Sequence, residues 1–213
     1  MTANRARGQR AGLTRQAVLE AAVRLVDREG IKALSMRRLG AELGVEAMTL
    51  YHHVPNKSAL LDGMIEQIVA EAVPPEFGAA TWREDLRAYA HALMAALAAH
   101  PHAVPLLLSR PAMTPRNLRT MEAVVAMLHE AGFPLRRTLD ILYSLTGFVV
   151  GQAAAQAGGV DGAGELASLD ADAYPLLVEA AREAGGDAAE GRFEFALDAL
   201  LSGYERELAL ARA

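Results

Sequence analysis

The apolar residues of this chain recur at the spacing of an α-helix along almost its whole length. Between residues 14 and 30, five of them fall on one helical face: Val18, Leu19, Ala22, Leu25 and Val26. No segment alternates apolar and polar residues over the length of a β-strand. The pattern therefore predicts an all-α protein with nine or ten helices.

Capping residues and helix breakers divide this pattern into separate helices. Five expected helices are each preceded by a side chain that can accept a hydrogen bond from the first helical turn: Thr14, Ser35, Asn56, Thr81 and Thr114. The later ranges with helical spacing are 135–157, 175–184 and 190–211. Residues 158–173 are rich in Gly, Ala and Asp, so we expect an exposed loop there.

The longest uncharged segment, Ile141 to Val160, is long enough to span a bilayer. It also contains hydroxyl and amide side chains and several glycines, so we expect a buried helix and no membrane contact. The basic residues before position 16 do not precede an unbroken apolar run, so we expect no signal peptide. The chain has no cysteine, which excludes disulfides and thiolate chemistry and favours the cytoplasm.

The net charge of −5 hides a division between two parts of the chain. Residues 1–57 carry a net charge of +5, whereas residues 58–213 carry −10. A basic amino-terminal part on an otherwise acidic chain is typical of a segment that meets a polyanion.

The spacing within residues 35–54 fits a helix-turn-helix. Gly40 is a small residue where two helices would cross closely, and Gly44 would form the turn. Val45 and Leu50 are apolar where the second helix would pack back on the first. The outward face of that second helix would then carry Ala47, Met48, Thr49, Tyr51, His52 and His53.

That outward face has the chemistry to meet double-stranded DNA. Hydroxyl and imidazole groups can donate to phosphates and base edges, and small apolar side chains can contact thymine methyl groups. Four residues flank the same surface: Ser35, Arg37, Arg38 and Lys57. Lys57 also lies in the first turn of the next expected helix, where backbone amides can hold a phosphate.

The run from Leu43 to Leu61, LGVEAMTLYHHVPNKSALL, resembles the amino-terminal domain of the TetR (tetracycline-repressor) family of bacterial regulators. The resemblance implies a three-helix DNA-binding domain at residues 1–56 with a basic amino-terminal arm. It also implies a helical effector-binding and dimerisation domain at residues 57–213. It further implies binding to a palindromic operator as a homodimer, with release by a small molecule.

The resemblance also assigns roles to single residues. Thr49, Tyr51, His53 and Lys57 match family positions that contact phosphates. Arg37, Ala47, Met48 and His52 match positions that can meet bases. Position 48 is often proline and position 52 often tryptophan in similar members, so we expect a different operator sequence here.

The carboxy-terminal part resembles the tetracycline-repressor branch more loosely, through Trp82, Arg110-Pro111 and Ala131-Gly132-Phe133. The positions that match drug and metal contacts in that branch hold Val73, Tyr89, Leu93 and Leu106 or Leu107 here. We therefore expect an apolar effector, with no metal and no other cofactor. The candidate lining is Tyr89, Leu93, Leu97, Leu107, Met121, Leu145, Phe148 and Gln152, of which Tyr89 and Gln152 would orient polar groups.

A two-fold dimer needs an interface, and two expected helices are the candidates. The helix at 135–157 contains Gly147 and Gly151, whose spacing permits close packing against another helix. The helix at 190–211 has a wide apolar face made of Phe193, Leu197, Leu200, Leu201, Tyr204 and Leu208. Paired across the axis, the two helices would form a four-helix bundle.

Three other functions stay open. The first is an enzyme or carrier with an all-helical apolar pocket, but no triad spacing, metal motif or phosphate-binding loop supports catalysis. His91, His100 and His102 lack the i, i+4 spacing with a nearby carboxylate that a helical metal site needs. The second and third keep the DNA-binding domain but make the protein an activator or a ligand-independent repressor.

Overall fold

The computed structural model describes residues 13–72, 81–109, 113–159, 162–184 and 188–212. These residues form α-helices and two short 3-10 helices, without any strand. The all-α prediction is therefore confirmed. The basic arm, Val73 and Arg110-Pro111 lie outside the described residues.

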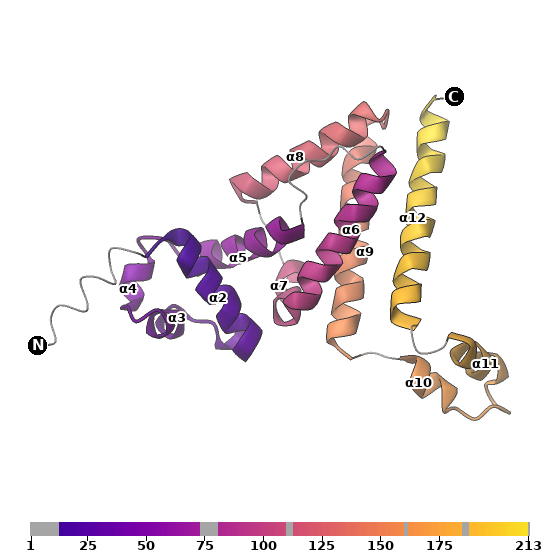
Figure 1. The fold of residues 1–213 in the computed structure, drawn as a ribbon, viewed down its shortest axis with the longest axis horizontal. Coiled ribbons are helices and arrows are strands. Elements are labelled where there is room, and N and C mark those ends of the chain that lie inside the picture. The colour runs from indigo at the N-terminus through magenta and orange to yellow at the C-terminus, as the bar shows by residue number, and fades with distance from the viewer. Residues whose placement is uncertain (1–12, 73–80, 110–112, 160–161, 185–187, 213) are drawn as a thin grey trace, which may run out of the picture.

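Figure 1 shows the helices in their order along the chain. Their bounds are α2 Arg15–Glu29, η1 Ile31–Ala33, α3 Met36–Glu42, α4 Ala47–Leu50, α5 Lys57–Ala72, α6 Trp82–Ala99, η2 Pro101–Ala103, α7 Val104–Ser109, α8 Pro115–Glu130, α9 Leu135–Ala157, α10 Gly162–Ala167, α11 Pro175–Ala184 and α12 Ala188–Arg212.

The expected capping residues start the helices as predicted. The side chains of Thr14, Ser35, Asn56, Thr81 and Thr114 each accept a hydrogen bond from the backbone N–H three residues later. The hydroxyl of Thr81 also donates to the carboxylate of Glu84 over 3.0 Å. Each cap satisfies a backbone donor that would otherwise lack a partner.

Two short helices were not expected. α10 lies inside residues 158–173, which we predicted to be a loop, and α7 follows the proline-containing turn η2. Both contain runs of good helix formers, Ala and Glu in α10 and Leu in α7, that are too short to show a periodicity. In Figure 1, α10 and α11 pack on each other and project away from the other helices.

Helices α2, α3 and α4 form the amino-terminal domain, at one end of the molecule (Figure 1). Leu25, Leu39 and Leu50, one from each helix, are fully buried in its core. α5 packs along α2, where Gly63 leaves room for the side chain of Leu19: a Cβ at Gly63 would lie 2.6 Å from it.

The carboxy-terminal domain is built around α9, which packs against α6, α7, α8 and α12. Its core contains Leu86, Leu145 and Val149. The ring of Trp82 at the start of α6 meets Phe133 edge to face, with the ring centroids 5.1 Å apart. Such aromatic contacts add to the free energy gained by burial and fix the two helix ends together.

The expected apolar face of the last helix has a different partner from the one we predicted. Phe193, Leu197, Leu201 and Leu208 are buried within the protomer, and Leu200 and Tyr204 are half-buried. Phe193 stacks on Phe148 of α9 with a centroid distance of 5.3 Å, and Tyr204 hydrogen-bonds Ser144. Four of the six side chains expected at the dimer contact are therefore already buried within the protomer, and the part of this helix in a dimer stays a prediction.

No single helix in the described ranges is both long enough and apolar enough to cross a membrane. One bent pair, α6 with residues 101–109, is together long and apolar enough for a membrane span, by length and composition alone. Its two parts meet at 97°. The uncharged segment that begins at Ile141 forms most of α9, with Leu145, Val149 and Ala153 buried, as predicted.

The crossing of α3 and α4 depends on Gly40. A Cβ at this position would lie 2.8 Å from the carbonyl oxygen of Val45 and 3.2 Å from the nitrogen of Ala47. Gly40 also accepts a hydrogen bond from the N–H of Val45 over 2.9 Å, and Gly44 makes the turn with φ of +66°. The close approach and the turn both require glycine here.

We therefore expect Gly40→Ala to lower the free energy of unfolding by about 1–3 kcal/mol, because backbone atoms must move to admit the methyl group. Thermal unfolding followed by circular dichroism measures this change. Gly191→Ala is the matched control, because nothing lies within 4 Å of a Cβ built at Gly191 in α12. An equal melting temperature for Gly40→Ala and the unaltered chain would contradict the close crossing.

Candidate DNA-binding surface and effector cavity

α4 presents the face that the sequence predicts. Leu50 is fully buried and Val45 is half-buried against α3, whereas Met48 is 69% exposed and Tyr51 is 41% exposed. His52 is also exposed, and three residues are half-buried: Ala47, Thr49 and His53. The chain turns once more after α4, where the N–H groups of His53 and Val54 both donate to the carbonyl of Leu50. The structure therefore brings this set together on one protruding surface.

Three of the flanking residues have partners within the protein. The hydroxyl of Ser35 caps α3, and the Nζ of Lys57 donates to the carbonyl of Leu34 over 2.9 Å. Arg38 forms ion pairs with Glu29 and Glu42, the latter over 3.4 Å. The hydrogen bond with Glu29 and its charge raise the pKa of Arg38 above its ordinary value.

Arg37 differs from Arg38. It is exposed, and it makes no ion pair with any residue that the structure describes. The carboxylates at the ends of α2 and α3 explain the difference, because Glu29 and Glu42 lie on the side of α3 that carries Arg38. The sequence contains both glutamates, but only the packing of α3 against α2 shows which arginine they bind.

A cavity of about 140 Å³ lies between the helices of the carboxy-terminal domain and α5. Its walls are mostly apolar and come from Ile65, Val69, Tyr89, Leu107, Met113, Asn117, Met121, Leu142, Tyr143, Thr146 and Val150. The hydroxyl of Tyr89 is hydrogen-bonded with Thr146. Burial raises the pKa of Tyr89 above its ordinary value, and the bond with Thr146 offsets part of that effect. Tyr89 therefore offers a buried neutral phenol to whatever enters the cavity.

Three of the expected lining residues, Tyr89, Leu107 and Met121, lie on this cavity. Leu93, Leu97 and Leu145 do not, because they are fully buried in the helical core. Two more residues of α9 also lie away from it: Phe148 stacks on Phe193, and Gln152 is half-buried outside the lining.

The expected and the observed lining residues of α9 differ in their helical register. The lining uses Leu142, Thr146 and Val150, which follow one another at intervals of four residues. We expected 145, 148 and 152, the neighbouring stripe of the same helix. Both stripes contain apolar residues, so only the packing of α9 against α6 and α8 determines which one faces the cavity.

The comparisons with known proteins cover both domains. Residues 18–64 match the model of bacterial regulatory proteins of the tetR family, and residues 74–208 match the tetracyclin repressor-like carboxy-terminal domain. The tetracycline repressor of class D from Escherichia coli is 32% identical over 93% of this chain and 92% of its own length. The transcriptional repressor DrrR1 from Streptomyces coeruleorubidus is 36% identical over 70% of this chain. The aligned region spans little more than half of DrrR1, 56% of its length.

Solved structures resemble the whole fold. Ligand-free ActR from Streptomyces coelicolor superposes with a TM-score of 0.81 and 28% identity, over 93% of this chain and 98% of ActR. ActR in complex with actinorhodin gives a TM-score of 0.77 and 29% identity, over 91% and 95%. Together with the family models, these matches confirm the resemblance seen in the Leu43–Leu61 run. The chain belongs to the tetracycline-repressor family.

Proposed function

We propose that this protein is a ligand-responsive transcriptional repressor that binds a palindromic operator as a dimer in the cytoplasm. The observation that carries the proposal is the rigid α3–α4 unit, whose exposed α4 face is fixed at Gly40 in a basic domain. The related proteins that are named as transcriptional repressors, and ActR bound to actinorhodin, support the same role. These related proteins also favour the function of a regulator over that of an enzyme.

On DNA, α4 would lie in the major groove. Tyr51 and His52 project from this surface with Met48, and they have no competing ion pair among the described residues. We assign Thr49, Tyr51 and His53 to phosphates, and Arg37, Ala47, Met48 and His52 to base edges. Arg38 and Lys57 would have to exchange their present partners before they could contact a phosphate.

The effector would be a small, mostly apolar molecule. The cavity offers it only a few hydrogen-bonding groups, among them the side chains of Tyr89, Asn117 and Thr146. The volume of about 140 Å³ is below that of a typical drug-sized site, which begins near ~300 Å³. Met113 and Met121 line the cavity, and their flexible side chains can move to enlarge it.

The dimer would form through the outward face of α9. Leu135, Leu139, Tyr143, Gly147 and Gly151 recur every four residues along it, and all five are exposed in the protomer, with Tyr143 also lining the cavity. Nothing lies within 4 Å of a Cβ built at either glycine, so another helix can approach closely. On α12, Phe195 and Leu210 are the exposed apolar residues that could extend this surface into a four-helix bundle.

We expect Tyr51→Ala to weaken binding to the operator by about tenfold or more, because it removes a donor that meets the DNA. The duplex would first be selected from random DNA with the unaltered protein, and its affinity measured by fluorescence anisotropy. Tyr174→Ala is the matched control, since Tyr174 is also exposed and directly precedes α11, which lies at the opposite end of the molecule from α4 (Figure 1). Equal affinities of Tyr51→Ala and the unaltered protein would refute the assigned surface.

We expect Leu139→Glu to convert the dimer to a monomer at micromolar concentration, because it buries a charge in the proposed interface. Analytical ultracentrifugation distinguishes the two states. Leu118→Glu is the control: Leu118 on α8 is 42% exposed and Leu139 is 44% exposed, but Leu118 lies outside the α9 surface. A Leu139→Glu protein that remains dimeric would show that another surface joins the protomers.

A further inference from the structure

Two methionine side chains lie outside the hydrophobic core of this protein. The chain has eight methionines and no cysteine, so thioethers are its only sulfur groups, and all of them except Met1 lie in the described residues. Five belong to the core or pack against it: Met36, Met64, Met94, Met121 and Met127. Met48 and Met113, in contrast, are 69% and 64% exposed. A dissolved oxidant therefore reaches these two thioethers before the others.

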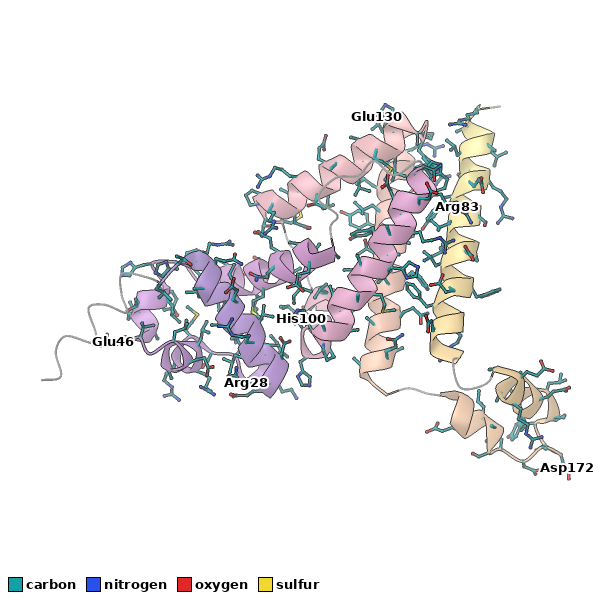
Figure 2. The ribbon with its side chains drawn as sticks, viewed as in Figure 1. Arg28, Glu46, Arg83, His100, Glu130 and Asp172 are labelled. Carbon is teal, nitrogen blue, oxygen red and sulfur yellow. The ribbon has the colours of Figure 1, made fainter. Side chains whose placement is uncertain are left out.

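Met48 occupies the middle of the surface that we assign to DNA. It is the second residue of α4, between the half-buried residues Ala47 and Thr49. The N–H of Thr49 donates to the carbonyl of Glu46 over 2.9 Å, and the N–H of Tyr51 donates to the carbonyl of Met48 over 3.3 Å. Figure 2 shows Glu46, which directly precedes α4, at the end of the molecule that carries the amino-terminal domain. A hydrogen-bonded backbone therefore presents this thioether to the solvent.

Packing within the protein does not account for a large apolar side chain at position 48. Moving such a side chain from water into a packed interior is favourable, but Met48 gains little of this energy because it is not part of the core that the described residues form. On a surface that binds DNA, the same side chain can bury its apolar atoms against the methyl groups of thymine. That contact depends on the sulfur remaining apolar.

Oxidation of the thioether removes this property. When hydrogen peroxide transfers one oxygen atom to Sδ, a sulfur lone pair attacks one peroxide oxygen and the O–O bond breaks. The proton of the transferred group passes to the departing oxygen, which leaves as water. The sulfur is oxidised by two electrons to a sulfoxide, and the peroxide is reduced by the same two electrons. The polar sulfoxide oxygen only accepts hydrogen bonds, so thymine methyl groups and phosphate oxygens offer it no donor.

We propose that Met48 is a site of reversible oxidation by hydroperoxides and that its sulfoxide releases the protein from the operator. This inference rests on the proposed function, because Met48 acts only through its contact with DNA. The oxidised protein keeps its fold, since Met48 lies outside the core. Reduction of the sulfoxide by methionine sulfoxide reductases restores the thioether, and with it the affinity for DNA.

The test measures the affinity for the selected duplex before and after treatment with hydrogen peroxide. The peroxide is removed before fluorescence anisotropy is recorded, and peptide mass spectrometry locates the added oxygen. In the unaltered protein, oxidation of Met48 should raise the dissociation constant by about tenfold or more. Incubation with methionine sulfoxide reductases A and B and dithiothreitol should restore the original value.

Met48→Leu separates the site from other effects of the oxidant. Leucine has nearly the same volume as methionine and stays apolar, so this variant should bind the duplex before treatment and keep its affinity afterwards. Met113→Leu is the matched control, because Met113 is similarly exposed but lines the effector cavity. The affinity of this variant should fall as it does in the unaltered protein.

A second measurement uses the unaltered protein alone. Saturating duplex should slow the oxidation of Met48 severalfold, because DNA covers its thioether, and it should leave the oxidation rate of Met113 unchanged. Equal rates at Met48 with and without duplex would overturn the proposal.

Two results of the affinity measurements would also overturn it and leave the proposed function intact. One is unchanged affinity of the unaltered protein with Met48 fully oxidised. The other is an equal loss of affinity in Met48→Leu and in the unaltered protein. Failure of the untreated, unaltered protein to bind any selected duplex would instead remove the proposed function as well.

Discussion

The structure depends on α5, because this one helix packs against both α2 and α6 within a single continuous core. Near its amino-terminal half, Gly63 meets Leu19 of α2, and Leu60 is fully buried. Closer to its carboxy-terminal end, Ile65 and Val69 line the cavity in the other domain. Because this core is closely packed, α5 cannot shift against α2 without also moving against α6. The amino-terminal and carboxy-terminal helices are therefore mechanically linked through α5.

The local features of the fold could be predicted from the sequence. Helix caps and the glycines of the α3–α4 crossing depend on residues within a few positions of one another, so the sequence contains all of the information. Ser35 and Gly40 are examples, since their partners Arg38 and Val45 are three and five residues away. The outward face of α4 follows from the same local geometry.

The cavity and the ion pairs could not be predicted in this way, because they depend on how distant helices pack. The stripe of α9 that contains Thr146 is hardly different in composition from the stripe that contains Phe148, yet only the first lines the cavity. Arg37 and Arg38 are neighbours in the sequence, but α2 brings Glu29 only to Arg38. His100 and Asp27 are 73 residues apart, and the contact of 2.9 Å between Nδ1 of His100 and Oδ2 of Asp27 has no signature in the sequence.

The charge of residues 1–57 affects how strongly the proposed DNA-binding surface attracts DNA. The net charge of +5 on residues 1–57 is the basis for attraction to DNA, and it already includes Glu29 and Glu42, which pair with Arg38 and Arg28. The other assigned residues, on α4 and directly after it, are two hydroxyl-bearing residues, two apolar residues and two histidines: Thr49, Tyr51, Ala47, Met48, His52 and His53. DNA binding by such a surface depends on its shape and on hydrogen bonds in addition to electrostatic attraction. The close crossing at Gly40, which holds α4 in position, is therefore more important.

In the proposed dimer, two copies of α4 read one operator. Hydroxyl-radical footprinting of the unaltered protein on its selected duplex distinguishes this arrangement from binding by a single α4. We predict two protected regions, related by a two-fold axis and centred about one or more whole helical turns apart, in steps of about 34 Å. A single protected region, or two regions without two-fold symmetry, would contradict the account.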